Sequence, residues 1–244
     1  MQEGVLLVEP LWLKESKYIV VFTGAGMSTE SGLPDFRSSQ NGLWKRKDPA
    51  QLASTDALNH NVHEFIEFYR ERVIGVKEYG PHEGHFILSN WEEKGMVKSI
   101  ITQNVDGFHQ LAGSKKVLEL HGTLQRVHCQ TCGKSYSSEL YIKKETMCGC
   151  GGVLRPSVVL FGEMLPQDVF MLAEQEAEKA DLFIVLGSSL QVSPANQFPL
   201  IAKESGAMLV IVNHDSTPYD EYADLVIRDQ KIGEWLKEMN KQMN

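Results

Sequence analysis

The chain has little of several features that mark specialised classes of protein. It has four cysteines, all between Cys129 and Cys150, so the rest of its 244 residues can hold no disulfide framework. Its apolar runs, such as 18–22 and 182–186, are far shorter than the ~20 residues that span a bilayer. It shows no internal repeat, and 42% of its residues are hydrophobic. We therefore expect a soluble globular protein with a sizeable core and no membrane contact.

Basic residues are also fewer than acidic ones. The chain has 24 Lys and Arg against 32 Asp and Glu, a net charge of −8 with neutral histidines. A protein whose main ligand is nucleic acid usually carries a basic footprint, so this balance disfavours that function and suits a cationic protein segment better. The stretch 1–17 carries Glu3, Glu9 and Pro10 where a signal peptide would need positive charge and an unbroken apolar run. We expect a cytoplasmic protein.

The cysteines follow the pattern C-x2-C-x15-C-x-C, at Cys129, Cys132, Cys148 and Cys150. Such a cluster is either a pair of disulfides or one structural zinc site. Short-spaced pairs are geometrically poor for bridging, and cytosolic thiols stay reduced, which favours zinc. Four thiolates close the coordination sphere and leave no position for a catalytic water. We predict one structural Zn²⁺ ion in an insertion over 125–153.

Five short runs read as strands, at 18–23, 99–102, 117–120, 182–186 and 208–212, and helical periodicity separates them, as at 63–77 and 167–180. Runs rich in Val and Ile that are apolar on both faces are typical of buried parallel strands. The alternation predicts an α/β fold, a doubly wound parallel Rossmann-like sheet. We assign 1–36, 82–124 and 154–244 to this sheet domain. The helical insertion 37–81 and the zinc ribbon 125–153 are predicted to form a smaller domain.

Small and polar residues follow several of these strands, at the edge where open α/β sheets bind ligands. A glycine turn at 24–26 lets backbone N–H groups approach a pyrophosphate, although Thr29 stands where the dinucleotide fingerprint has a third glycine. Other strand ends carry Gln103, Asn104, Asp106, His121, Gly187, Ser188, Ser189 and Asn213. A turn that only packs a helix, a helix cap at Asp106 and a structural His121 are the alternatives. A histidine at such an edge is a candidate general base.

Six motifs, in order along the chain, resemble the sirtuin family of NAD-dependent protein lysine deacylases, of bacterial or archaeal type. They are GAGMSTESGLPDFR at 24–37, TQNVD at 102–106, HG at 121–122, the four-cysteine module, the run 155–163 and GSS at 187–189. The match extends from about residue 18 to residue 224. The resemblance implies an enzyme that transfers an acyl group from lysine to ADP-ribose, with release of nicotinamide and acyl-ADP-ribose. NAD would be consumed as a co-substrate.

The resemblance also implies roles for individual residues. Three would be catalytic: His121 as the general base, with Asn104 and Asp106. The residues implied to bind NAD are Gly24, Ala25, Gly26, Asp35, Phe36, Arg37, Gln103, Asn104, Asp106, Gly187, Ser188, Ser189 and Asn213. Acyl-lysine peptides would be the partners, paired as an added strand against Val159, Phe161, Gly162 and Val192, which would also wall the tunnel for the acyl-lysine.

The spacing of a tyrosine and an arginine bears on which acyl group the enzyme would remove. Tyr69 and Arg72 stand three residues apart on a predicted helix, and Ala53 precedes them, as in the sirtuin subclass that removes succinyl or malonyl groups. There the Tyr and Arg bind the acyl carboxylate. The alternative is an exposed Arg72 that pairs with Glu67 or Glu71. Because Asp35 and the Gly-Phe pair at 107–108 are more like general deacetylases, we expect a deacetylase with some desuccinylase or demalonylase capacity.

Other functions stay open at this point. A mono-ADP-ribosyltransferase would use the same NAD pocket but pass ADP-ribose to a protein. A zinc-bearing module that only binds NAD or nucleic acid would not release nicotinamide. A dehydrogenase is disfavoured by the altered glycine fingerprint. We expect a monomer.

Overall fold

The computed structural model describes residues 11–34 and 52–243. Its strands are β1 (Ile19–Thr23), β2 (Val97–Thr102), β3 (Val117–Glu119), β4 (Gly122–Cys129), β5 (Ser135–Ser137), β6 (Leu154–Val158), β7 (Leu182–Leu186), β8 (Met208–Val212) and β9 (Leu225–Ile227). Its α-helices are α1 (Leu11–Glu15), α3 (Thr55–His60), α4 (Val62–Glu78), α5 (Glu83–Glu93), α6 (Phe108–Leu111), α7 (Glu139–Ile142), α8 (Gln167–Lys179), α9 (Phe198–Glu204) and α10 (Ile232–Met243). Short 3₁₀ helices are η1 (Ala25–Ser31), η3 (Ala195–Gln197) and η4 (Asp220–Tyr222).

Six strands form one sheet in the order β3-β2-β1-β7-β8-β9, and every neighbouring pair is parallel. The chain builds outward from β1 through β2 to β3, then returns to β7 and builds outward through β8 to β9. The strand order therefore reverses between β1 and β7, whose last residues, Thr23 and Leu186, lie in register. A doubly wound sheet binds ligands at the carboxyl ends of the strands beside such a switch point.

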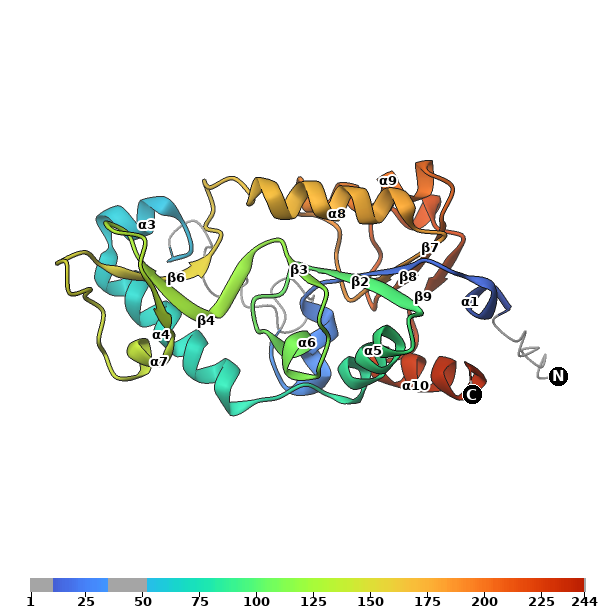
Figure 1. The fold of residues 1–244 in the computed structure, drawn as a ribbon, viewed down its shortest axis with the longest axis horizontal. Coiled ribbons are helices and arrows are strands. Elements are labelled where there is room, and N and C mark those ends of the chain that lie inside the picture. Colours follow the sequence, from blue (N-terminus) through green and yellow to red (C-terminus); the bar gives the residue numbers. More distant parts are fainter. Residues whose placement is uncertain (1–10, 35–51, 244) are drawn as a thin grey trace.

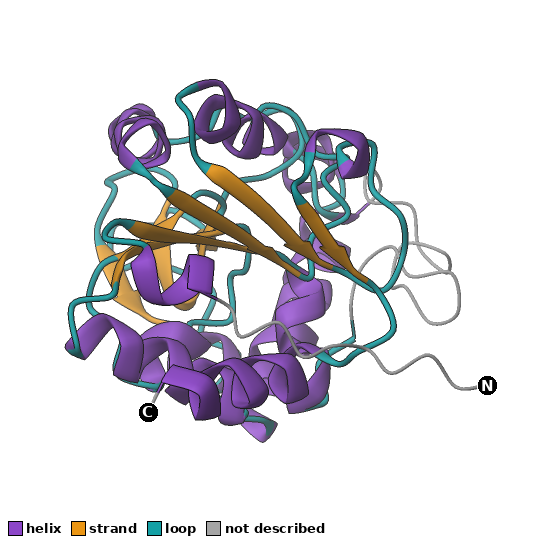
Figure 2. Ribbon diagram, turned by 90° about the vertical axis from the view of Figure 1, so that its right-hand side faces the viewer, coloured by secondary structure: helices purple, strands orange, loops and turns teal. Residues whose placement is uncertain are grey.

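Two layers of helices bury the sheet (Figures 1 and 2). Alternate residues of each strand point to opposite faces, so Val21 packs with Trp91 of α5 and Leu236 of α10, whereas Phe22 packs with Phe198 of α9. All five residues of β1 and of β7 are buried, which explains why these strands are apolar on both faces. Each buried Val, Ile, Leu or Phe side chain contributes about 1.5–3 kcal/mol by leaving water. The predicted doubly wound α/β fold is confirmed.

A smaller lobe, at the left of Figure 1, is built from the antiparallel sheet β5-β4-β6 and helices α3, α4 and α7. Its core is separate and contains Phe65, Tyr69, Tyr141 and Leu154. The predicted helix at 63–77 is α4. The domain boundaries stay a prediction, but this second sheet begins at Gly122 and ends at Val158, on either side of the predicted 125–153 insertion.

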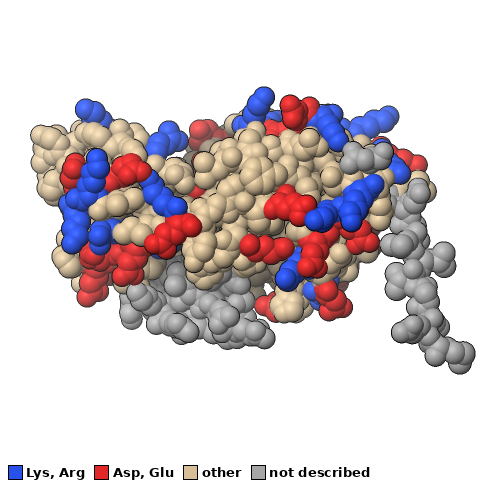
Figure 3. Space-filling model, turned by 90° about the horizontal axis from the view of Figure 1, so that it is seen from below, with Lys and Arg blue, Asp and Glu red and all other residues tan. Residues whose placement is uncertain are grey.

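Within 11–34 and 52–243, no helix is both long and apolar enough to cross a bilayer. On the face drawn in Figure 3, basic side chains lie among acidic ones at both ends of the molecule, and the described residues there form no continuous basic patch.

Candidate active site and metal centre

A cavity of about 1490 Å³ lies at the carboxyl edge of the parallel sheet, between the two lobes. The sheet side contributes Gly26, Gln103 and His121, and the small lobe contributes Tyr69. Ligand pockets usually hold roughly 300–1,000 Å³, so this one has room for more than a single small molecule.

The glycine turn after β1 is packed directly against the end of β7. Gly24 N–H donates to Leu186 O (3.0 Å), Gly26 N–H to Gly187 O (2.9 Å), and Gly187 N–H to Val212 O (2.9 Å). A Cβ on Gly26 would lie 2.7 Å from the Gly187 Cα, and Gly187 itself has φ +63°. No side chain fits there, so the three strand ends meet backbone to backbone, and no Cβ of these glycines stands between a ligand and the edge of the sheet.

Most of the residues predicted to bind NAD line this cavity, among them Ala25, Gly26, Gln103, Asn104, Gly187, Ser188, Ser189 and Asn213. The Ser188 hydroxyl donates to Gln103 Oε1 (2.8 Å), which ties the end of β7 to the loop after β2. Asn213, after β8, donates from Nδ2 to Asp215 O (2.7 Å). A row of glycines and small polar side chains along one wall fits an extended dinucleotide. Asp35, Phe36 and Arg37 lie outside the described residues.

Asn104 and Asp106 meet through a serine that the sequence reasoning did not select. Asn104 Nδ2 donates to Gly24 O (3.0 Å) and to Ser28 Oγ (3.3 Å), and the Ser28 hydroxyl donates to Asp106 Oδ2 (2.8 Å). Asp106 Oδ1 accepts from Phe108 N–H (2.9 Å), so this carboxylate is buried behind the cavity wall and is not among the lining residues. Burial raises the pKa of Asp106, and the Phe108 N–H and the Ser28 hydroxyl oppose that rise.

His121 follows β3 and lies half-buried in the cavity wall. Its Nδ1 is 3.1 Å from Gln103 O. A carbonyl oxygen only accepts hydrogen bonds, so Nδ1 must carry the ring proton and Nε2 must carry the lone pair. The backbone thus selects the tautomer in which Nε2 can take up a proton.

Ala53, Tyr69 and Arg72 lie together on the small-lobe side of the same cavity. Arg72 is half-buried, with its guanidinium carbon 5.5 Å from the centre of the Tyr69 ring. Burial lowers the pKa of Arg72 and raises that of Tyr69, and the attraction between the two groups opposes both shifts. It is Arg70 that pairs with Glu67 (3.2 Å). The structure therefore places Arg72 in the cavity wall, not on an exposed helix face.

Val159, Phe161, Gly162 and Val192 also line this cavity. Val159 N–H donates to His121 O (2.9 Å). Phe161 N–H donates to Ala53 O (2.9 Å), and Phe161 O accepts from Thr55 N–H (3.1 Å). Because the backbone of Phe161 is already paired with the small lobe, what Phe161 offers a ligand is its ring, which is 44% exposed.

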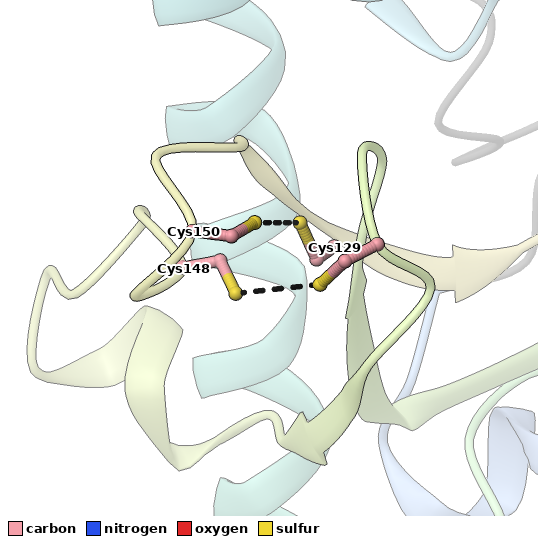
Figure 4. Close-up of side chains that lie close together, drawn as sticks. Cys129, Cys148 and Cys150 are labelled. Atoms are coloured by element: carbon pink, nitrogen blue, oxygen red, sulfur yellow. Dashed lines mark hydrogen bonds between the residues drawn. The ribbon is translucent and has the colours of Figure 1, made fainter.

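The four cysteines form a separate site in the small lobe (Figure 4). Cys129 Sγ is 3.5 Å from Cys150 Sγ, Cys132 Sγ is 3.7 Å from Cys148 Sγ, and all four sulfurs lie within 4.8 Å of one another. Tetrahedral Zn–S bonds of about 2.3 Å put sulfurs about 3.8 Å apart, whereas a disulfide needs about 2.05 Å. The Cys150 N–H and the Tyr136 hydroxyl lower the pKa of Cys148 to about 6, whereas at Cys150 the Gly152 N–H is outweighed by the bonds to the other three thiols, which raise the pKa to about 12, so the sulfur positions are what indicate a metal. The site fits one structural zinc ion.

Comparisons with known proteins agree with this geometry. Residues 24–194 match the Sir2 family. An NAD-dependent protein deacetylase of Oceanobacillus iheyensis is 69% identical over 95% of this chain and 98% of that protein, and one of Sulfurisphaera tokodaii is 46% identical over 92% and 90%. A solved Sir2 variant with a deacetylated p53 peptide and 3′-O-acetyl ADP-ribose has a TM-score of 0.89 at 41% identity, covering 94% of this chain and 95% of that one. A Sir2 complex with a p53 peptide and NAD⁺ has a TM-score of 0.85 at 41% identity, with the same coverage. The chain therefore belongs to the Sir2 family, the sirtuins.

Proposed function

We propose that this protein is an NAD-dependent protein lysine deacetylase, which transfers the acetyl group of an acetyl-lysine to ADP-ribose and releases nicotinamide. The observation that carries the proposal is the His121 tautomer: Gln103 O holds the proton on Nδ1, so Nε2 is the basic nitrogen of a histidine on the wall of a cavity large enough for two ligands. The names of the relatives and the acetyl ADP-ribose in a related structure support the same activity.

In this proposal, the glycine turn, Ser188, Ser189 and Asn213 bind the dinucleotide along the sheet edge. The acyl oxygen attacks the anomeric carbon of the ribose, the new C–O bond forms, and the bond to nicotinamide breaks. His121 Nε2 then takes the proton of a ribose hydroxyl, which turns that oxygen into a nucleophile toward the acyl carbon. Exclusion of water at the first step keeps the activated ribose from simple hydrolysis. After the ribose oxygen has bonded to the acyl carbon, one water adds there, the bond from that carbon to the lysine nitrogen breaks, and the lysine leaves as the free amine with the acyl group on ADP-ribose.

Asn104, Ser28 and Asp106 have different parts in this scheme. Asn104 lines the cavity and is the group that contacts the nicotinamide end. Asp106 acts through Ser28. Its carboxylate accepts the hydrogen bond of the serine hydroxyl, so the Ser28 oxygen is left to accept a hydrogen bond from Asn104 Nδ2. This fixes the orientation of the Asn104 amide. Asp106 is then a positioning residue more than a direct ligand.

The test is a product assay with NAD and matched acetyl-, succinyl- and longer-acyl-lysine peptides, in which mass spectrometry detects nicotinamide and acyl-ADP-ribose. We expect the wild type to form both from the acetyl peptide. The variant His121→Ala should keep its fold and lose activity by roughly 10²–10⁴-fold. Nicotinamide release with ADP-ribose attached to the peptide, and no free acyl-ADP-ribose, would instead indicate an ADP-ribosyltransferase.

We further propose some activity on succinyl- and malonyl-lysine. Arg72 supports it because a guanidinium in the cavity wall, beside the Tyr69 ring and the small Ala53 side chain, can bind a carboxylate with two parallel hydrogen bonds. Arg72→Met should lower the succinyl-to-acetyl rate ratio by at least about tenfold, the loss of one charge-assisted interaction. Arg70→Met is the matched control, since Arg70 pairs with Glu67. If the two variants had the same ratio as the wild type, Arg72 would not select the acyl group.

The remaining parts of the proposal concern the metal ion, the cellular location and the oligomeric state. The four cysteines hold one structural zinc ion that takes no part in the reaction, because four thiolates complete its coordination. Reduced cysteines suit the cytoplasm, and cell fractionation tests that location. We propose a monomer, which light scattering tests directly.

A further inference from the structure

An ion pair between a buried arginine and a partly exposed glutamate connects strand β6 to the loop that follows it. Arg155, in β6, is 7% exposed, and its two terminal nitrogens donate to Glu163: Nη1 to Oε1 (2.6 Å) and Nη2 to Oε2 (2.9 Å). This two-point geometry is the most directional form of an Arg–carboxylate pair. Neither residue is explained by the reaction proposed above.

The same two side chains also hold the backbone between them. Arg155 Nη2 donates to Val158 O (2.7 Å), and Glu163 Oε2 accepts from Leu160 N–H (2.9 Å). Glu163 N–H donates to Leu160 O (3.0 Å). The pair therefore closes the segment 158–163 into a loop of defined shape, which we call the clamp loop.

The clamp loop connects His121 with the small lobe. Val159 reaches His121 O, and Phe161 is paired with Ala53 and Thr55 in the small lobe. Every residue from 158 to 163 lines the cavity, and none of the hydrogen bonds that hold this loop involves the glycine turn that we assign to NAD. A change in the loop should thus alter how an acyl-lysine peptide is held, with little effect on the dinucleotide wall.

The charge of the pair needs an explanation, because Arg155 is withdrawn from water at a cost in free energy that a partly exposed carboxylate offsets only in part. Burial raises the pKa of Glu163, but the hydrogen bonds from Arg155 and Leu160 N–H outweigh it and hold the pKa below its ordinary value, so the pair is charged at neutral pH. What apolar residues cannot supply is the set of hydrogen bonds to Val158 O and Leu160 N–H. The ion pair therefore serves to fix the backbone shape of the clamp loop.

We propose that Arg155 and Glu163 are positioning residues that give the clamp loop its shape and so determine the affinity for the acyl-lysine peptide. This inference rests on the deacetylase function proposed above. If the proposal is right, loss of the pair raises the KM for peptide but not the KM for NAD. A pair that only stabilised the fold would affect both KM values.

The experiment uses two variants of the full-length protein and steady-state kinetics with each substrate varied in turn. Glu163→Gln keeps the size of the side chain but removes the charge. We expect at least about a tenfold rise in the peptide KM and a change of less than about twofold in the NAD KM. The Kd of a fluorescent acetyl-lysine peptide should rise in parallel.

The second variant, Arg155→Met with Glu163→Met, keeps the experiment decisive if the single variant unfolds. Two apolar residues leave no unpaired buried charge, so Tm should return to near the wild-type value, whereas the peptide KM should stay raised. A peptide KM that recovers together with Tm would overturn the proposal, and so would equal rises in both KM values.

A matched control is Asp224→Asn. Asp224 also pairs with a cation, Lys203 (2.6 Å), and accepts a backbone N–H, from Leu209 (2.8 Å), but it directly precedes β9 and is not among the residues that line the cavity. Its variant should leave both KM values unchanged. If the wild type itself forms no acyl-ADP-ribose, the deacetylase proposal fails. If the wild type is active and Glu163→Gln has a wild-type peptide KM, only the clamp proposal fails.

Discussion

Two buried histidines beneath the site should make this protein sensitive to mild acid. His85 of α5 and His109 of α6 are 0% and 1% exposed, and their ring centres are 4.9 Å apart. His85 Nδ1 accepts from His82 N–H, and His109 Nε2 lies 3.0 Å from Thr23 Oγ1. The remaining ring nitrogen of each has no hydrogen-bond partner among the residues that the structure describes. Burial therefore lowers the pKa of His85 to about 2 and that of His109 to about 3.

The size of the effect follows from proton linkage. In the unfolded chain both histidines titrate near 6.5, so below that pH the unfolded state binds protons that the folded state rejects. This contribution to stability is fully present above pH 6.5 and is lost as pH falls toward 3. Between pH 7 and pH 5 each histidine should lower the free energy of unfolding by about 2 kcal/mol, or about 4 kcal/mol for both.

Urea unfolding at pH 7, 6 and 5 measures this loss, with tryptophan fluorescence as the signal. Trp91, on the same helix as His85, and Trp235 are both buried in the core on that face of the sheet. His85→Gln and His109→Gln should each remove about 2 kcal/mol of the loss between pH 7 and pH 5, whatever they do to stability at pH 7. His63→Gln, at an exposed position on α4, is the control and should leave the loss unchanged.

Acid also weakens zinc–thiolate bonds, and it does so equally in every variant. The contribution of the histidines is therefore the difference between variants in the free energy of unfolding lost from pH 7 to pH 5. An identical loss between pH 7 and pH 5 in the wild type and in both buried-histidine variants would refute the reasoning. It would mean that the two rings are protonated in the folded protein at pH 5.

Two further predictions concern the glycine turn and the metal site. Gly187→Ala should lower stability by at least about 2 kcal/mol and raise the NAD KM, because φ is +63° and the new Cβ would lie 2.4 Å from the Met27 nitrogen. Gly95→Ala, with φ +73° and no atom within 4 Å, is the control for backbone strain alone; equal effects would exclude the close approach as the cause. Removal of zinc with a strong chelator should lower Tm and abolish activity through loss of the small lobe, and added Zn²⁺ should restore both. A chelated protein that kept the wild-type Tm would show that the four thiols need no ion.

Local patterns in the sequence predicted those parts of the fold whose signal lies in neighbouring residues. Strands β7 and β8 have the predicted bounds, because five consecutive apolar residues buried on both faces leave little ambiguity. Strands β4, β5, β6 and β9 were not predicted. β5 and β9 have three residues each, and β6 contains Arg155 and Pro156, so neither length nor alternation marks them.

In the site, too, short motifs could be predicted and contacts between distant segments could not. Glycine turns, strand ends and cysteine spacing in the sequence marked Gly26, Ser188, His121 and the metal ligands, because each needs only its own short motif. The sequence could not show that Asp106 lies behind the cavity wall and reaches Asn104 through Ser28, since those three residues belong to two separate strand ends.

The sequence by itself therefore determined the fold class, the four-cysteine site and the family resemblance, all of which rest on residue types at short spacing. Only the tertiary structure decided which way Arg72 faces, which His121 nitrogen carries the proton and what Arg155 and Glu163 hold. The physical reason is that these properties depend on contacts between segments distant in sequence. Hydrogen-bond direction and burial are set there by packing, which residue identity alone does not specify.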